Sequence, residues 1–469
     1  MIFTHLRVID DRFLKKIKIF HWFAISSVFT DLILNILHQL RCICIKNIKK
    51  LPSRNNSSFF ILHSSFFFIT LQKQNKPKMK ILFYCDTVFG YGGVERVLSV
   101  IAKAMTEHHD VTILSTDMRA DTAMYGYEKS DVKFEYISYP HKKSIEQFCC
   151  KAYSCLYKKM LPKCSVTSAG YSKSFFLPSY KKALTEKINS GGYDVVIGVH
   201  AFLSLHLASI RNRLNAKKVI GWMHNSYEAL FVKDNPYLPG LKHFFAHEMS
   251  KLDNIVVLSK ADVKRFQQEL GLRSVCIYNP LTLEPHGRAS FNNKRFIGVG
   301  RFAHKHKGFD ILLKAFAEYC KRHDDGWTLE LVGEGPEQPM YEEIIKANNI
   351  GDSGDRVTIS PFTNDIQSHY AGASVYVLSS RWEGFGLVLI EAMSHGLPII
   401  ASDIPVAKEL LEDSGTCLFF RNEDVDDLVE KMEQIIDESK WQKMSENAIK
   451  HSKYYNIGNI MLKWYDIAK

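Results

Sequence analysis

The chain has 469 residues, of which 46% are hydrophobic and 24% are charged, and its formal net charge at pH 7 is +11. These values exclude a disordered or fibrous chain, and the length predicts a globular protein of two or three domains. The ten cysteines are scattered without the C-x2-C spacing of zinc sites, so we expect no metal site and a reducing cytoplasmic setting.

The first 78 residues differ in character from the rest. Two apolar runs, Ile19–Leu37 and Phe59–Leu71, are separated by basic and polar residues. The first run is long enough to span a membrane, but it contains Asp31, and an acid at the bilayer centre costs about 3 kcal/mol. Met79 opens MKILFYCD, which is typical of the first strand of an α/β enzyme. We therefore expect residues 1–78 to be a non-native upstream extension, with a weak membrane anchor as the alternative.

From Met79 onward, apolar runs of strand length alternate with segments of helical period, the pattern of a doubly wound α/β protein. Strands are predicted at Ile81–Cys85, Val111–Ser115, Val195–Val199, Val219–Met223 and Ile255–Leu258. Helices are predicted at Val94–Glu107 and from Lys260 onward. We assign residues 79–284 to a first Rossmann-like domain.

A glycine-rich loop, Gly90–Gly93, joins the first predicted strand to the first helix. Such a loop resembles a dinucleotide-binding turn, and Asp117 follows the second strand, where a ribose-binding acid lies in Rossmann folds. The third glycine of G-x-G-x-x-G is absent, however, because Glu95 takes its place. Gly92 and Gly93 are candidate ligand-binding residues, and a tight turn without a ligand is the alternative.

Residues 141–182 contain nine lysines and a single acid, Glu146, with aromatic residues between them. The aromatic residues are Phe148, Tyr153, Tyr157, Phe175, Phe176 and Tyr180. This composition is typical of a segment that contacts an anionic membrane surface. Nucleic acid is the rival partner, but no nucleic-acid motif accompanies the segment. A solvated excursion of helix and loop is the remaining alternative.

The segment Tyr278–Ser290 contains proline and glycine without a helical period, and it predicts a linker. A second α/β unit starts at Arg295, and we assign residues 291–453 to a second Rossmann-like domain. Its strands are predicted to include Leu329–Val332, Val357–Ile359 and Val375–Leu378. Aromatic residues near helical spacing predict a terminal helix over residues 454–469.

Two basic residues, Arg301 and Lys307, follow the strand that opens the second unit, within Gly300-Arg301 and Lys307-Gly308. A diphosphate at a sheet edge needs cations, and each charge-assisted hydrogen bond contributes about 1.5–3 kcal/mol. Arg301 offers a planar fork of donors and Lys307 a point charge. Two solvated basic residues are the alternative interpretation.

The stretch RWEGFGLVLIEAMSHGLPII, residues 381–400, is the most informative in the chain. An apolar strand, Ala373–Ser380, leads into a glycine loop that opens a helix over Leu387–Met393. Gly396 ends the helix and Pro398 leads into the next strand. Ligands of parallel sheets bind beyond the carboxyl ends of the strands, so this loop is predicted to bind a ligand.

Two carboxylates belong to this stretch, Glu383 in the loop and Glu391 in the helix. Gly384 and Gly386 let backbone amides approach a ligand, and the start of a helix suits a phosphate. Glu391 interrupts an apolar helix, and a carboxylate among core residues needs a partner. Hydroxyl groups of a sugar fit that role, so the predicted ligand is a nucleotide sugar.

The frame EGFGL…EAM.HGLP around Glu383 and Glu391 resembles the E-x7-E motif of retaining glycosyltransferases of family 4. Those enzymes have the GT-B fold, in which two Rossmann-like domains face each other across a cleft and a C-terminal helix crosses back to the first domain. The segment from Gly300 to Gly308 resembles the family's G-R-L-x(n)-K-G pattern, with Phe302 in place of the usual leucine.

The resemblance implies roles for individual residues. His224, a lone histidine after a predicted strand, matches one that contacts the transferred sugar and stabilises developing charge; Asn225 and Glu228 would then line the acceptor side. Residues implied in catalysis are His224, Glu383, Arg301 and Lys307. Residues implied in donor binding are Gly92, Gly93, Arg301, Lys307, Gly333, Gly335, Gly384, Phe385, Gly386, Leu387 and Glu391.

The activity implied is metal-independent transfer of a hexosyl or N-acetylhexosaminyl group from a nucleotide sugar, with UDP-sugars favoured, and with retention by front-face attack. No D-x-D metal site accompanies the motifs, since Asp424–Asp426 opens a predicted helix as a capping turn. The segment GWMHNSYEALF resembles bacterial enzymes of cell-surface polysaccharide biosynthesis. A lipid-linked acceptor and the inner face of the cytoplasmic membrane are therefore expected.

Three other functions stay open at this point. A GT-B nucleotide-sugar epimerase would need acid and base groups but no acceptor. An NAD oxidoreductase is disfavoured by the incomplete glycine pattern. A catalytically inactive module that binds a membrane or a partner would not require Arg301, Lys307, Glu383 and Glu391 together.

Overall fold

The structure is a computed structural model that describes residues 78–118, 121–139, 145–232, 236–302, 306–350 and 356–469. The predicted upstream extension or anchor falls on residues 1–77 and Lys78, almost wholly outside these ranges, so it stays a prediction. Within the described ranges, no helix combines the length and apolar character needed to cross a membrane.

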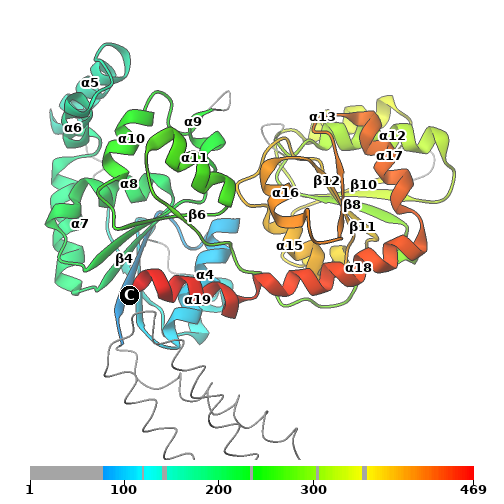
Figure 1. Ribbon diagram of the computed structural model, residues 1–469, viewed down its shortest axis with the longest axis horizontal. Coiled ribbons are helices and arrows are strands. Elements are labelled where there is room, and N and C mark those ends of the chain that lie inside the picture. Colours follow the sequence, from blue (N-terminus) through cyan, green and yellow to red (C-terminus); the bar gives the residue numbers. More distant parts are fainter. Residues whose placement is uncertain (1–77, 119–120, 140–144, 233–235, 303–305, 351–355) are drawn as a thin grey trace, which may run out of the picture. The chain divides into compact units, whose positions relative to one another are not determined.

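Within the described residues, the first sheet has seven parallel strands in the order β3-β2-β1-β4-β5-β6-β7 (Figure 1). They are β1 (Lys80–Cys85), β2 (Asp110–Ser115), β3 (Lys133–Tyr136), β4 (Val195–Val199), β5 (Lys218–Trp222), β6 (Asn254–Val257) and β7 (Val275–Cys276). The strand order reverses at β1, which pairs with β2 on one side and β4 on the other. Ligands bind at such a switch point in doubly wound sheets.

Helices pack on both faces of this sheet (Figure 1). The helices of this domain are α4 (Gly93–Thr106), α5 (Ile145–Lys159), α6 (Ser165–Ser174), α7 (Pro178–Gly191), α8 (Ala201–Ile210), α9 (Tyr227–Phe231), α10 (Lys242–Met249) and α11 (Lys260–Leu270). Of these, α5 packs on α6 and α6 packs on α10, so both lie outside the layer that covers the sheet. Because both faces are covered, the strands are continuous apolar runs, and Ile81 through Tyr84 of β1 are 0% exposed. This is why the sequence located β1, β2, β4, β5 and β6 but missed the half-exposed edge strands β3 and β7.

The second sheet, as far as the chain is described, has six parallel strands in the order β10-β9-β8-β11-β12-β13. They are β8 (Arg295–Val299), β9 (Thr328–Val332), β10 (Val357–Ser360), β11 (Val375–Leu378), β12 (Ile399–Ser402) and β13 (Cys417–Phe420). Its helices are α12 (Phe309–Arg322), α13 (Gln338–Ala347), α14 (Ile366–Ala371), α15 (Leu387–Ser394), α16 (Pro405–Leu411), α17 (Val425–Ile435) and α18 (Glu438–Ser452). The fold is GT-B, as the sequence predicts.

Two predicted helix boundaries are confirmed by local geometry. Gly396 follows α15 with a φ of 77°, a left-handed conformation that disfavours a residue with a side chain. Asp424 accepts a hydrogen bond from the backbone N–H of Asp427 at 3.0 Å and so caps α17. The D-x-D sequence at Asp424–Asp426 therefore belongs to a helix cap.

The terminal helix α19 (Ile457–Ala468) packs against α4 of the first domain. Trp464 is fully buried there, with its ring centroid 4.9 Å from that of Trp222. Lys218 Nζ donates a hydrogen bond to the carbonyl oxygen of Ile467 at 3.1 Å. The predicted return of the C-terminal helix to the first domain is confirmed.

We expect Trp464→Ala to lower the free energy of unfolding by about 3–5 kcal/mol, because it deletes a buried aromatic side chain and leaves a cavity. The midpoint of urea unfolding measures this loss. Leu462→Ala is the matched control, since Leu462 lies on the same helix and is 69% exposed, and we expect a change within about 0.5 kcal/mol. Equal effects of the two substitutions would contradict the packing role of Trp464.

Candidate functional site

A cavity of about 960 Å³ is lined by residues of both Rossmann-like domains. Nearly all of the predicted site residues line it, namely Gly92, Gly93, His224, Arg301, Lys307, Gly333, Glu383, Gly384, Phe385, Gly386, Leu387 and Glu391. Its volume is in the range of small-molecule sites, about 300–1,000 Å³. The motifs that are far apart in the sequence therefore meet in one ligand-sized space.

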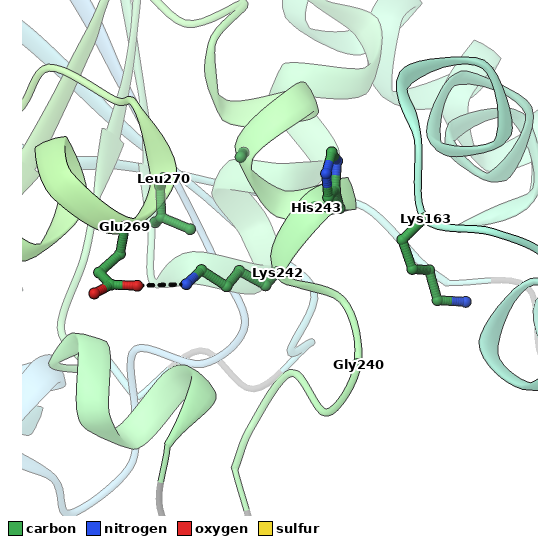
Figure 2. A pocket seen from close by; sticks show the side chains of 7 residues that line it. Lys163, Gly240, Lys242, His243, Glu269 and Leu270 are labelled. Atoms are coloured by element: carbon green, nitrogen blue, oxygen red, sulfur yellow. Dashed lines mark hydrogen bonds and ion pairs between the residues drawn. The ribbon is translucent and has the colours of Figure 1, made fainter.

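A smaller cavity of about 310 Å³ lies beside α10 and contains none of the predicted site residues (Figure 2). Lys242 and Glu269 form an ion pair across it, with Nζ and Oε2 2.6 Å apart. The two side chains neutralise each other, and the pair is well exposed. The larger cavity is therefore the candidate site.

Glu383 and Lys307 form an ion pair in the larger cavity, with Lys307 Nζ 2.7 Å from Glu383 Oε1. Ser380 Oγ donates to the same oxygen at 2.7 Å. Burial alone would raise the pKa of Glu383, but the charge of Lys307 and these two hydrogen bonds outweigh it and hold the pKa below its ordinary value. Glu383 is therefore ionised at neutral pH, which suits binding of hydroxyl groups rather than proton donation.

Two glycines shape the loop that carries Arg301 and Lys307. A Cβ on Gly308, whose φ is +63°, would lie 1.9 Å from the carbonyl oxygen of Ser379. A Cβ on Gly300 would lie 2.9 Å from Cε of Lys307. Lys307 and Gly308 thus lie directly on the carboxyl end of β11, which brings Lys307 to Glu383. Arg301 is exposed at the cavity wall.

Gly333 and Gly335, both implied in donor binding, lie in different surroundings. Gly333 lines the cavity, and a Cβ there would lie 2.0 Å from the carbonyl oxygen of Gly300. Gly335 is absent from the described lining of the cavity, and a Cβ there would lie 2.3 Å from the carbonyl oxygen of Phe302. The structure places Gly335 where it lets two loops approach, rather than beside the space for a ligand.

Glu391 has the partner that its burial requires, and the partner is a side chain of the first domain. Its side chain is 2% exposed, and Oε1 lies 2.8 Å from Nη2 of Arg96 on α4. Thr282 Oγ1 donates to Oε1 at 3.3 Å, and the hydroxyl of Tyr370 donates to Oε2 at 3.2 Å. Arg96 is not among the residues predicted from the sequence; its one local signal is its place in the first turn after Gly92 and Gly93.

The glycine loops of the two domains meet at the cavity. A Cβ on Gly384 would lie 2.9 Å from the carbonyl oxygen of His224, and a Cβ on Gly93 would lie 3.0 Å from Cδ1 of Leu387. Gly386 has a φ of +79° and precedes the first residue of α15. The unpaired N–H groups at the start of α15 therefore belong to the same cavity as Lys307, a combination that suits an anion.

His224 lies after β5 and is 9% exposed, with its ring centroid 4.2 Å from that of Trp222. Burial, and then the proximity of His200, hold the pKa of His224 well below its ordinary value. Its imidazole is therefore neutral at physiological pH, and Nε2 has no hydrogen-bond partner among the described residues. A neutral ring can exchange hydrogen bonds with a hydroxyl group, but it supplies no positive charge.

Asn225 and Glu228 do not join His224 in the described lining of the cavity. Glu228 is instead paired with Arg265, whose Nε donates to Oε1 at 3.0 Å. Glu228 lies in α9, which directs it towards Arg265 of α11. A role of Asn225 and Glu228 on the acceptor side therefore stays a prediction.

The linker Tyr278–Ser290 contributes to the site, which its sequence does not indicate. Asn279 and Thr282 line the cavity. Asn279 is 4% exposed, and its Oδ1 has no hydrogen-bond partner among the described residues. Glu409 of α16 holds the linker by accepting a hydrogen bond from the hydroxyl of Tyr278 at 2.8 Å. A buried amide without a partner is costly unless a ligand or water completes it.

Comparisons with known proteins agree with this arrangement. The family model Glycosyltransferase Family 4 matches residues 91–284, and the family model Glycosyl transferases group 1 matches residues 286–451. An uncharacterised glycosyltransferase of Haemophilus influenzae is 31% identical over 299 residues, which cover 63% of this chain and 81% of the relative. These matches confirm the resemblance carried by residues 381–400.

Two further proteins are similar over most of the chain. The GalNAc-alpha-(1->4)-GalNAc-alpha-(1->3)-diNAcBac-PP-undecaprenol alpha-1,4-N-acetyl-D-galactosaminyltransferase of Campylobacter jejuni is 27% identical over 393 residues, covering 82% of this chain and 97% of the relative. The crystal structure of Anabaena HepE with UDP and glucose shares the fold, with a TM-score of 0.60 at 19% identity, and covers 83% of this chain and 98% of that one. The protein thus belongs to glycosyltransferase family 4 and is a glycosyltransferase with the GT-B fold.

Proposed function

We propose that the protein transfers a hexosyl or N-acetylhexosaminyl group, with retention of configuration, from a nucleotide sugar to a lipid-linked glycan in cell-surface polysaccharide biosynthesis. UDP-sugars are the favoured donors. The observation that carries the proposal is the meeting of Arg301, Lys307, Glu383 and Glu391 with two glycine loops in one cavity of about 960 Å³. A nucleotide sugar needs this combination of cations for its diphosphate and carboxylates for its hydroxyl groups.

The cationic side of the cavity supports a role in departure of the nucleotide. As the glycosidic bond breaks, negative charge grows on the leaving diphosphate, and Arg301, Lys307 and the amides of Gly384–Leu387 stabilise it. Glu391 binds the ribose hydroxyl groups, and Glu383 orients the transferred sugar. An oxygen of the leaving phosphate accepts the proton of the acceptor hydroxyl as that hydroxyl forms its bond to the anomeric carbon on the same face, so no glycosyl-enzyme intermediate forms.

Two relatives support the choice of substrates. HepE was solved with UDP and glucose, which supports a UDP-sugar donor here. The name of the Campylobacter jejuni enzyme includes a PP-undecaprenol acceptor, which supports a lipid-linked acceptor. The proposal includes peripheral contact with an anionic membrane through residues 141–182, at the inner face of the cytoplasmic membrane.

A donor panel tests this proposal. The full chain is incubated with UDP-glucose, UDP-galactose, their N-acetyl forms and GDP-mannose, and release of the nucleoside diphosphate is measured with and without a lipid extract as acceptor. We expect turnover of one UDP-sugar, accelerated by the extract. The anomeric configuration of the product should be the same as that of the donor. Conversion of a donor to its epimer without an acceptor, or an inverted product, would contradict it.

Metal independence is a separate prediction. We propose that Arg301 and Lys307 carry the charge balance of the diphosphate, so transfer should continue in excess EDTA at about the same rate, whereas metal-dependent enzymes place a divalent ion on the phosphates. The measurement is the initial rate with EDTA, followed by addition of Mg²⁺ or Mn²⁺. Complete loss of activity in EDTA that either ion restores would overturn this part of the proposal.

A further inference from the structure

Helix α5 has an apolar face that is exposed rather than packed. Ile145 is 84% exposed and Phe148 74%. They belong to a stripe with the spacing of one helical face, made of Ile145, Phe148, Cys149, Ala152, Cys155 and Leu156, all exposed. We call these six residues the outer stripe of α5. Met160, 77% exposed, and Val166, 81% exposed, continue its apolar character beyond the end of the helix.

The opposite face of α5 anchors the helix, so the exposure of the outer stripe does not come from a loose helix. Tyr157 is fully buried and stacks on Tyr171 of α6, with ring centroids 4.3 Å apart. The hydroxyl of Tyr157 is hydrogen-bonded to Ser168 at 2.9 Å. Because α6 in turn packs on α10 of the domain (Figure 1), α5 holds its outer stripe on a fixed support.

This arrangement changes which residues of 141–182 face outward. Tyr157, Phe176 and Tyr180 are buried, and Tyr153 and Phe175 are half-buried. Of the aromatic residues in the predicted membrane segment, Phe148 is the one that the described structure leaves exposed. Most of the aromatic side chains that alternate with lysines in the sequence therefore pack in the core. The exposed apolar surface consists of aliphatic side chains, cysteines and Phe148.

The charges around the outer stripe are positive. Lys151 and Lys158 lie along one flank, two helical turns apart, and Lys159 lies at the end; all three are exposed. The acid of this helix, Glu146, is turned to α7, where it accepts hydrogen bonds from the backbone N–H and the hydroxyl of Ser179, both at 2.8 Å. An apolar stripe flanked by lysines, without an exposed acid on the same face, matches a helix that lies in a membrane interface.

We propose that the outer stripe of α5, with Met160 and Val166, is the surface on which this protein docks to an anionic phospholipid bilayer. The apolar side chains enter the headgroup region while Lys151, Lys158 and Lys159 bind lipid phosphates. A second copy of the chain is a poorer occupant, because two such faces would bring their lysines together. The inference rests on the proposed function and deepens it, since a lipid-linked acceptor is anchored in the same bilayer.

Vesicle flotation with the full chain tests the docking surface. Vesicles of phosphatidylcholine alone and with phosphatidylglycerol are compared for the wild type and for Ile145→Asp/Phe148→Asp. We expect binding to the mixed vesicles to fall by about tenfold or more in the double variant, because two charges replace the side chains that insert. Leu462→Asp is the control, since Leu462 is an apolar residue on α19 that is also well exposed, at 69%, and this variant should bind like the wild type.

A second measurement reports insertion directly. Cys149 is exposed within the outer stripe and is labelled with an environment-sensitive fluorophore after Cys155 and Cys164 are changed to serine. We expect a blue shift of the emission on addition of mixed vesicles, and a weaker response when Lys151, Lys158 and Lys159 are changed to glutamine. If the lysines contribute, added salt should weaken binding to the mixed vesicles.

The outcomes separate this inference from the enzymatic proposal. Equal vesicle binding by the wild type and the double variant, or no blue shift, would overturn the docking surface. Dimers of the wild type that the double variant lacks would assign the outer stripe to a second copy instead. Donor turnover without vesicles should be unchanged in the double variant; absence of donor turnover in the wild type, with vesicle binding intact, would overturn the proposed activity alone.

Discussion

Replacing Lys307 with alanine is expected to reduce kcat for glycosyl transfer by about 10²–10³-fold, the effect of removing one preorganised group that stabilises transition-state charge. The loss has two physical sources. The leaving diphosphate loses a cation, and Glu383, at 10% side-chain exposure, loses the ion pair that joins them at 2.7 Å. Without that pair the pKa of Glu383 should rise, since the charge of Lys307 is the largest influence that opposes the effect of burial. Steady-state kinetics with the donor identified in the panel measures kcat and KM.

Two further variants distinguish catalysis from folding. Lys321→Ala removes a lysine that is 64% exposed on α12, and its kcat should match the wild type. Lys307→Arg keeps the charge with a different geometry and should recover part of the rate. Transfer at the wild-type rate by Lys307→Ala, with an unchanged unfolding midpoint, would remove Lys307 from the mechanism and with it the assignment of the diphosphate site.

The second large effect is expected at Arg96. Arg96→Ala leaves the carboxylate of Glu391 buried at 2% exposure without its counter-ion, and breaking a buried pair in this way costs about 3–5 kcal/mol. We therefore expect a lower unfolding midpoint and weaker binding of the nucleoside diphosphate, because the side chain of Glu391 would lose the contact that fixes its position. Thermal unfolding and calorimetric titration with UDP measure the two losses.

A double-mutant cycle isolates the Arg96–Glu391 pair. Glu391→Gln removes the charge but retains the size of the side chain, so Arg96→Ala should cost much less in the Glu391→Gln background. Glu391→Ala should abolish transfer whether residue 96 is arginine or alanine, because the ribose contact is absent. Arg322→Ala, which removes a 42% exposed arginine paired with Glu318, controls for general charge removal and should cost less than about 1 kcal/mol. Additive losses at Arg96 and Glu391 would contradict the pair.

Much of the fold of this protein can be predicted from its sequence, because the patterns that indicate it involve residues close together in the chain. A parallel strand covered on both faces must be apolar throughout, so β1, β4 and β11 are visible as runs such as Ile81–Cys85. The loops that approach phosphate need glycine at fixed positions, and Gly308, with a Cβ that would meet Ser379 at 1.9 Å, is one such position. Motifs that combine strand, glycine loop and helix therefore predict both the fold and the donor side of the cavity.

Other parts of the site depend on contacts between residues far apart in sequence. Arg96 pairs with Glu391 across the two domains, and Asn279 is buried in the cavity although its segment has the composition of a linker. Apart from its place after Gly92 and Gly93, nothing in the neighbours of Arg96 distinguishes it from a solvated helical arginine, because its partner is brought to it only when both domains are folded.

The same reason explains the segment 141–182. Its composition predicts membrane contact, but composition does not state which face of a helix is covered. Packing against Tyr171 buries Tyr157, whereas Phe148 and Ile145 stay exposed. Residue types and their spacing are enough for the two Rossmann-like domains and the phosphate-binding loops, since those follow from local backbone geometry. Which charges pair, which polar groups await a ligand and which apolar face remains uncovered are set by long-range packing.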